Sequence, residues 1–404
     1  MSFELTFLGS SGGPLEGTTC AILLKPSNVE YADIVAGKLH DELVCIDAGS
    51  GLAQLTEIIY NEMLHQQPTS RLSKYYPNSL PVHSYYSAEV TTPFKDLKAD
   101  SCFQASQGIF NCMSTYLITH PHLDHISSLV INSASFSKLN PKTVYGSIYT
   151  VSALQNNVFN GIIWPNMPSF DILKLVSRDY WKQFTINNGK YTITMFDLSH
   201  GELVKHESKK NGTIGTTTLT QEAQYSHQKK HYISSAFLIS YNPTNDLILI
   251  FGDFESDLVS KLDNNRRIWR HIAPIITSGE KKLKGIVLEC SNCNGYPEAE
   301  LYGHLTPSYL ISELLALEAA CLEISPDSVR PLEGLNIIIN HVKEPILGGS
   351  CAAPEDDCSA KSSTEKEVIL DPRQKILHDL NEQNKLENLG LNISIGLNGI
   401  SIKL

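Results

Sequence analysis

The 404-residue sequence lacks several features that would place it in common functional classes. It has no run of eighteen apolar residues, the length needed to cross a bilayer, and no basic and apolar leader at its amino terminus. Its nine cysteines are scattered and odd in number, which argues against a disulfide-stapled secreted domain. We therefore expect a cytoplasmic protein with reduced thiols and no membrane partner.

Clusters of positive charge are also missing. The formal net charge is −11 at pH 7, and the longest basic groupings are Arg266-Arg267 and Lys281-Lys282-Leu283-Lys284. Proteins that bind long nucleic acids usually present a basic patch, so we expect no such partner. A small anionic substrate stays compatible, because bound divalent cations would dominate the local field.

Strand-like and helix-like segments alternate along the chain without an internal repeat or linker, which predicts a single domain over residues 1–404. Residues 61–108, with four prolines and several tyrosines, are interpreted as an insertion that forms a lid, a homodimer surface, or neither. The polar tracts 206–230 and 348–367 are predicted flexible loops, because they bury too little apolar surface. Near the end, 371–389 predicts a helix and 392–397 begins a predicted pair of strands.

The most informative segment is His120-Pro121-His122-Leu123-Asp124-His125, directly after the strand-like residues 114–119. In an extended segment alternate side chains share a face, so His120 and His122 point the same way. Apolar residues at 126, 129, 130 and 134 indicate a helix that brings Asp124 and His125 to a neighbouring point. One tetrahedral zinc ion rarely takes four ligands from so short a stretch, so the segment predicts two metal ions.

Further ligand types follow three other predicted strands. His200 ends the segment 191–200, Asp253 follows the apolar run 246–251, and His341 follows 335–340. His206 is an alternative to His200 but lies in a lysine-rich polar tract, and His227 and His231 are interpreted as surface histidines.

Asp47 ends a further strand-like segment, residues 42–48. We expect its carboxylate to orient a ligand histidine through a hydrogen bond, a role that metal sites commonly require. Capping of a turn is the alternative role for this aspartate.

The order HxHxDH, later His, Gly-Asp and later His resembles the metallo-β-lactamase superfamily. That superfamily has an α/β fold with mixed sheets, a four-layer αββα sandwich that carries a two-metal site at one edge. The stretch from His120 to Ala134 is more specific and is similar to the signature of the class II cyclic-nucleotide phosphodiesterases. This second resemblance extends to residues 7–14, 289–291, 301–307 and 340–343.

The resemblance implies a binuclear site with zinc as the best-suited metal and manganese or magnesium as alternatives. It implies hydrolysis of cyclic AMP, cyclic GMP or both to nucleoside 5′-monophosphates by a hydroxide that the two metals activate. The implied ligands are His120, His122 and His200 for one ion, Asp124, His125 and His341 for the other, and Asp253 as the bridge.

Two further residues are candidates for contacts with the substrate. His304 stands just before a predicted helix with Thr306 as its cap and Pro307 at its first position, and could protonate the leaving oxygen or bind phosphate. Lys343 would share a face with His341 if that strand continued, and could contact the phosphate. Trp164, Tyr302 and Phe254 could stack a purine, but aromatic side chains more often belong to the core.

Three alternative functions stay open. A tRNA 3′-processing nuclease shares the phosphodiester chemistry, but such enzymes need a basic surface or arm to hold RNA. A thioester or β-lactam hydrolase would use the same ions on a carbonyl carbon. A non-catalytic scaffold is the third alternative, although such proteins usually lose metal ligands and none is missing here.

Overall fold

The computed structural model describes residues 2–65, 67–202, 231–280, 282–345 and 370–404. The predicted flexible loops 206–230 and 348–367 lie outside these ranges, as do His206 and His227. Among the described residues, no helix is both long and apolar enough to cross a membrane.

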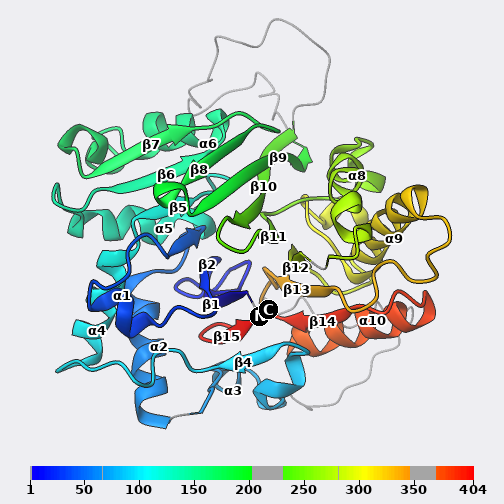
Figure 1. The fold of residues 1–404 in the computed structure, drawn as a ribbon, viewed down its shortest axis with the longest axis horizontal. Helices are drawn as coiled ribbons and strands as arrows, with labels where there is room; N and C mark the ends of the chain where they lie inside the picture. The colour runs from blue at the N-terminus through cyan, green and yellow to red at the C-terminus, as the bar shows by residue number, and fades with distance from the viewer. Residues whose placement is uncertain (1, 66, 203–230, 281, 346–369) are drawn as a thin grey trace, which may run out of the picture.

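The described strands form two mixed sheets, one of eight and one of seven strands (Figure 1). The first sheet has the order β4-β15-β1-β2-β3-β5-β6-β7. Its strands are β1 (Phe3–Gly9), β2 (Ala21–Pro26), β3 (Val44–Ile46), β4 (Glu89–Thr91), β5 (Thr115–Leu117), β6 (Lys142–Gly146), β7 (Leu173–Ser177) and β15 (Ser401–Lys403). The second sheet has the order β14-β13-β12-β11-β10-β9-β8. Its strands are β8 (Gln183–Ile186), β9 (Tyr191–Glu202), β10 (His231–Tyr241), β11 (Asp246–Phe251), β12 (Leu283–Glu289), β13 (Asn336–Asn340) and β14 (Asn392–Ile395).

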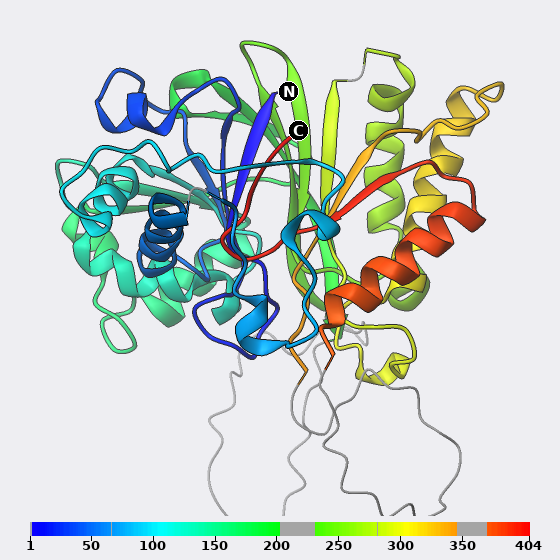
Figure 2. The same cartoon turned by 90° about the horizontal axis from the view of Figure 1, so that it is seen from below.

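Helices cover the outer face of each sheet, so the layers follow the predicted αββα order (Figure 2). On the side of the first sheet are α1 (Tyr31–Val35), α2 (Leu52–His65), α4 (Cys102–Cys112) and α5 (Leu123–Asn132). On the side of the second are α8 (Asn264–Thr277), α9 (Pro307–Ile324) and α10 (Pro372–Leu386). The shorter helices are α3 (Leu72–Tyr75), η1 (Val82–Tyr85), η2 (Ser133–Ser135), α6 (Ile148–Ala153), η3 (Leu154–Val158), η4 (Met167–Phe170), η5 (Asn187–Gly189), α7 (Asp257–Ser260) and η6 (Glu298–Glu300).

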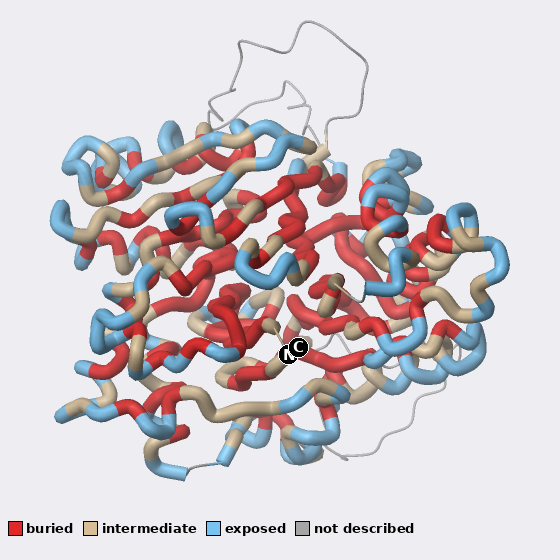
Figure 3. The backbone as a smooth tube through the Cα atoms, viewed as in Figure 1, coloured by how far each residue is buried: buried red, intermediate tan, exposed pale blue. Residues whose placement is uncertain are grey.

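Alternation along the strands explains why the sheets stack. In β2, Ile22 and Leu24 belong to the core between the sheets, whereas Ala21 and Leu23 pack under the helices of the first layer. Both faces of the central strands are therefore buried, and most residues of these strands are coloured as buried in Figure 3. Apolar burial on two faces is the main term that stabilises such a four-layer fold.

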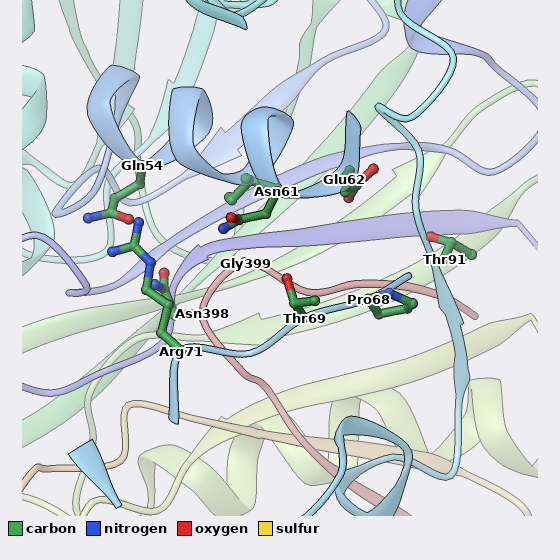
Figure 4. A pocket seen from close by; sticks show the side chains of 10 residues that line it. Gln54, Asn61, Glu62, Pro68, Thr69, Arg71, Thr91, Asn398 and Gly399 are labelled. Carbon is green, nitrogen blue, oxygen red and sulfur yellow. The ribbon is translucent and has the colours of Figure 1, made fainter. Parts of the chain in front are cut away.

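The interpreted insertion, residues 61–108, begins inside α2 and ends inside α4, and it supplies the edge strand β4, which pairs with β15. Beside it lies a pocket of about 10 Å³, into which Gln54, Asn61 and Arg71 point (Figure 4). That volume holds one water molecule and is too small for a nucleotide. The single-domain, lid and dimer-surface interpretations stay predictions.

Both predicted closing strands are present, but they do not pair with each other. β14 pairs in parallel with β13 in the second sheet, whereas β15 lies between β1 and β4 in the first. Between them the chain crosses from one sheet to the other at Gly396, where a Cβ would come within 2.8 Å of the Phe7 ring. The two strands are therefore neighbours in sequence but members of different layers.

Candidate metal centre

The ends of strands from both sheets bring the predicted ligands together. β11, β12 and β13 are parallel, so the residues that follow them meet at one edge of the second sheet. β5 leads at the same edge into His120 and then into α5, which begins at Leu123 with Asp124 in its first turn. β9 continues past His200 to Glu202 rather than ending there as predicted.

The seven predicted ligands lie in one cluster, arranged as two groups. In each group the candidate ligand atoms are within 4.8 Å of one another. In the first, Nε2 of His200 is 3.3 Å from Nδ1 of His122. In the second, Nε2 of His341 is 3.3 Å from Oδ2 of Asp124. The first group is His120, His122 and His200, and the second is Asp124, His125, Asp253 and His341.

Asp253 lies where the two groups meet. Its Oδ2 is 3.7 Å from Nε2 of both His120 and His200, which belong to the first group. The same oxygen is 3.3 Å from Nε2 of His125 and 3.0 Å from Nε2 of His341, in the second group. The carboxylate is 2% exposed, so its charge is compensated by groups of the protein or by bound cations rather than by water.

Protein groups hold the outer ring nitrogen of each of four histidines. Nδ1 of His125 donates to Oδ2 of Asp47 at 2.7 Å, and Nδ1 of His200 donates to the carbonyl of Gly303 at 3.0 Å. Nδ1 of His120 is 3.0 Å from the Thr119 hydroxyl, and Nδ1 of His341 is 2.8 Å from that of Ser291. In the neutral form of each ring, these bonds select the tautomer that leaves Nε2 unprotonated and facing the cluster, as in metal sites.

The cluster fits divalent metal ions by an observation independent of any family. Nε2 of His120 and Nε2 of His125 are buried and have no hydrogen-bond partner among the described residues. Buried polar atoms rarely stay unsatisfied, and an imidazole nitrogen without a partner is a ready metal ligand. Histidine nitrogens combined with carboxylate oxygens form a donor set that suits zinc and related ions.

Burial and the neighbouring carboxylates shift the pKa values of the cluster in opposite directions. Burial lowers the pKa of His120 well below its usual value and that of His200 to about 3, which keeps both imidazoles neutral. Burial opposes ionisation of Asp253, but His341 and His125 outweigh it and hold the pKa of this carboxyl well below its usual value. Burial also lowers the pKa of His341, yet Asp253 and Asp124 raise it to about 9. The concentrated negative charge thus attracts cations, whether protons or metal ions.

His304 lies over this cluster, next to the predicted start of α9 at Pro307 with Thr306 as N-cap. Its ring stacks on that of His341 at a centroid distance of 5.1 Å, and its Nδ1 is 2.9 Å from Oε1 of Glu289. Glu289 is itself buried and its pKa is lowered, because the effect of His304 outweighs that of burial. A buried carboxylate therefore orients the His304 ring.

The geometric argument for Lys343 is wrong. β13 ends at Asn340, and His341 has a φ of 57°, in the left-handed region. Extended alternation is broken there, so Lys343 does not share a strand face with His341. The backbone N–H of Lys343 donates instead to the carbonyl of Ser291 at 3.0 Å. A phosphate contact for its side chain stays a prediction without that support.

The sequence reasoning missed several residues of the site. Glu289 ends the apolar strand β12, the same signal that singled out Asp253, and Ser291 follows two residues later. The Ser291 hydroxyl is 2.6 Å from Oε2 of Glu289 and so links this carboxylate to His341. The surface interpretation of His231 is wrong, because its side chain is 17% exposed and lies 3.0 Å from the Ser199 hydroxyl.

Comparison with known proteins assigns the chain to a protein family. The family model for "cAMP phosphodiesterases class-II" matches residues 32–399. A 3′,5′-cyclic-nucleotide phosphodiesterase of Candida albicans is 45% identical over 442 residues, with 100% of both chains covered. 3′,5′-cyclic-nucleotide phosphodiesterase 1 of Saccharomyces cerevisiae is 29% identical, covering 100% of this chain and 99% of that one.

A solved structure, that of unliganded yeast PDE1, matches with a TM-score of 0.76 and 27% identity over 100% of this chain and 99% of that chain. The family match over residues 32–399 thus agrees with the fold and with the order of the motifs. The chain belongs to the class II cyclic AMP phosphodiesterases, as its sequence motifs predict.

Proposed function

We propose that this chain hydrolyses 3′,5′-cyclic nucleotides to nucleoside 5′-monophosphates at the histidine–aspartate cluster. The single observation that carries the proposal is the convergence of two ligand groups on Oδ2 of the buried Asp253. Family membership supports the reaction class, and the buried cluster supports this location for the reaction.

The two groups are proposed to bind one divalent ion each, with zinc preferred. His120, His122 and His200 would hold one ion, Asp124, His125 and His341 the other, and Asp253 would bridge them. When bound, such ions lower the pKa of a water molecule and polarise a phosphoryl oxygen. Asp47 serves this arrangement by holding His125 in the tautomer whose Nε2 can bind metal.

His304 is proposed to protonate the departing 3′ oxygen. Attack of water on phosphorus breaks the bond to the 3′ oxygen and leaves the phosphate on the 5′ carbon. The alkoxide that departs needs a proton, which a positioned imidazole can supply. Because Nδ1 of His304 is held by Glu289, Nε2 is the nitrogen left to carry that proton. The buried Glu289 carboxylate fixes the orientation of the ring for this transfer.

An assay of purified protein tests the function. Cyclic AMP, cyclic GMP, bis(p-nitrophenyl) phosphate and a β-lactam are each offered before and after treatment with a chelator. We expect turnover of a cyclic nucleotide that the chelator abolishes and added zinc restores. Turnover of the β-lactam without hydrolysis of either cyclic nucleotide would overturn the proposal. Turnover that the chelator does not affect would exclude a role for metal ions in the reaction.

A matched pair of variants places the reaction at the cluster. Asp246 is the first residue of strand β11, and Asp253 follows the end of the same strand. Asp246 forms an ion pair with Lys284 at 2.9 Å. We expect Asp253→Ala to lose activity together with bound metal, whereas Asp246→Ala keeps both. Wild-type turnover by Asp253→Ala would contradict the bridging role.

A further inference from the structure

Two large apolar side chains are exposed next to the cluster in the sequence. Tyr302, two residues before His304, is 74% exposed. Leu123, between His122 and Asp124, is 72% exposed. The residues on either side of Tyr302 are buried and those on either side of Leu123 are partly buried, so both exposed side chains border residues of the site. Exposed apolar groups beside a polar centre often mark the place where a ligand's apolar part rests.

The backbone of Tyr302 is anchored to the metal centre although its ring is exposed. The carbonyl of Gly303 accepts the Nδ1–H of His200 at 3.0 Å. A Cβ on Gly303 would lie 2.5 Å from the carbonyl carbon of His200, so this turn packs tightly on β9. Tyr302 itself has a φ of 50°, a left-handed conformation that is rare for aromatic residues and that persists where the surroundings impose it. The ring is therefore presented from a fixed position.

A second tyrosine lies against the first ligand group. The ring of Tyr232, at the start of β10, is 5.4 Å from that of His122 in an edge-on arrangement. It is 6.5 Å from the ring of His200, the residue that the Tyr302 turn contacts. Tyr232 is half-buried, so part of the ring stays available. The site thus has aromatic surface on two elements that approach it independently.

The other aromatic candidates are unsuitable. Phe254 is fully buried in the core between the sheets. Trp164 packs against the core of the first helix layer and donates its Nε1–H to the Ser133 hydroxyl at 3.0 Å. Of the three aromatics considered from the sequence, Tyr302 alone is both exposed and joined to the cluster.

We propose that Tyr302 is the stacking surface for the purine base of the substrate, with Tyr232 and Leu123 completing an apolar rim. This inference rests on the proposed function, because the phosphate at the cluster places the base one sugar ring further out. Aromatic faces bind bases by stacking, which tolerates different bases because every base has a π face. The subsite therefore selects for a nucleobase over a base-free cyclic phosphate, and selects only weakly between adenine and guanine.

Three tyrosine variants and a base-free substrate test the proposal. Tyr302→Asn removes the ring with a residue that tolerates positive φ, and Tyr302→Phe keeps the ring. Tyr60→Asn is the matched control, since Tyr60 is 51% exposed on α2. For cyclic AMP we expect Tyr302→Asn to raise KM about tenfold with kcat little changed, the usual scale for loss of one stacking contact. We expect Tyr302→Asn to hydrolyse ribose 3′,5′-cyclic phosphate with the same KM and kcat as the wild type. With cyclic AMP, Tyr302→Phe and Tyr60→Asn should match the wild type.

Equilibrium binding gives a readout independent of turnover. Calorimetry on zinc-loaded protein compares AMP with ribose 5-phosphate, which differ by the base alone. We expect the wild type to prefer AMP and Tyr302→Asn to lose most of that preference. The same preference in both proteins, or an equal KM for cyclic AMP, would overturn the base subsite. A wild-type enzyme that hydrolyses neither cyclic substrate would overturn the proposed function instead.

Discussion

Replacement of Asp47 by asparagine should weaken metal binding without removing any ligand. The Asp47 carboxylate is 5% exposed and accepts from Nδ1 of His125 at 2.7 Å and from the backbone N–H of Thr119 at 2.8 Å. Asparagine keeps one acceptor oxygen but turns an amide N–H₂ toward the His125 ring. To accept from that amide, Nδ1 must lose its proton, and Nε2 then carries it. A protonated Nε2 cannot bind a metal ion.

The magnitude follows from the role of such partners. Groups that orient a ligand histidine typically contribute 10- to 100-fold to metal affinity, or about 1.4–2.7 kcal/mol. The loss should fall on the group that contains His125, Asp124, Asp253 and His341. The group with His120 should be less affected, because its link to Asp47 runs through the Thr119 hydroxyl, which donates to Asp47 at 2.9 Å.

The assay is a competition titration of zinc against a fluorescent chelator, which separates two binding steps. Glu313→Gln is the matched control, since Glu313 is a 3% exposed carboxylate that accepts from the Ser256 hydroxyl, the Asp257 N–H and the Trp269 indole. The Glu313→Gln variant should be less stable than the wild type but should bind both zinc ions with unchanged affinity. Equal zinc affinities in Asp47→Asn and wild type would refute the reasoning, as would equal losses in the two variants.

Two further predictions concern catalysis and stability. His304→Ala should retain its metal content and lose about 10²- to 10⁴-fold in kcat, the scale of a general acid; unchanged kcat in a steady-state assay would exclude that role. Burial raises the pKa of Glu62 from 4.5 to about 8. The contribution of this group to the free energy of unfolding is therefore full below about pH 4.5 and is lost as the pH rises through about 8. Urea unfolding at low and high pH should show this loss, on the order of a few kcal/mol, in the wild type and not in Glu62→Gln; parallel curves for the two proteins would contradict it.

The parts of the site that the sequence predicts share one physical signal. An apolar run long enough for one buried strand, followed at once by a ligand residue, predicts a side chain at a sheet edge. Asp253 after β11 and His341 after β13 were found in this way, and the structure places both in the cluster. Glu289 at the end of β12 carries the same signal, but its role depends on its distance to His304, which a sequence pattern does not contain.

Other features depend on backbone conformation or tertiary contact. The left-handed φ of His341 breaks the alternation on which the argument for Lys343 relied, and nothing in the residues around it indicates that conformation. The separation of β14 from β15 depends on the packing of Gly396 on Phe7, residues far apart in the chain. Local pattern identified the strands, whereas only the packed fold determines which sheet each one joins.

The most direct test of the two-metal account is anomalous diffraction at the zinc edge from crystals grown with excess zinc. The account predicts two strong peaks per chain, one among His120, His122 and His200 and one among Asp124, His125 and His341, with the Asp253 carboxylate contacting both. One peak alone, or peaks away from this cluster, would contradict it.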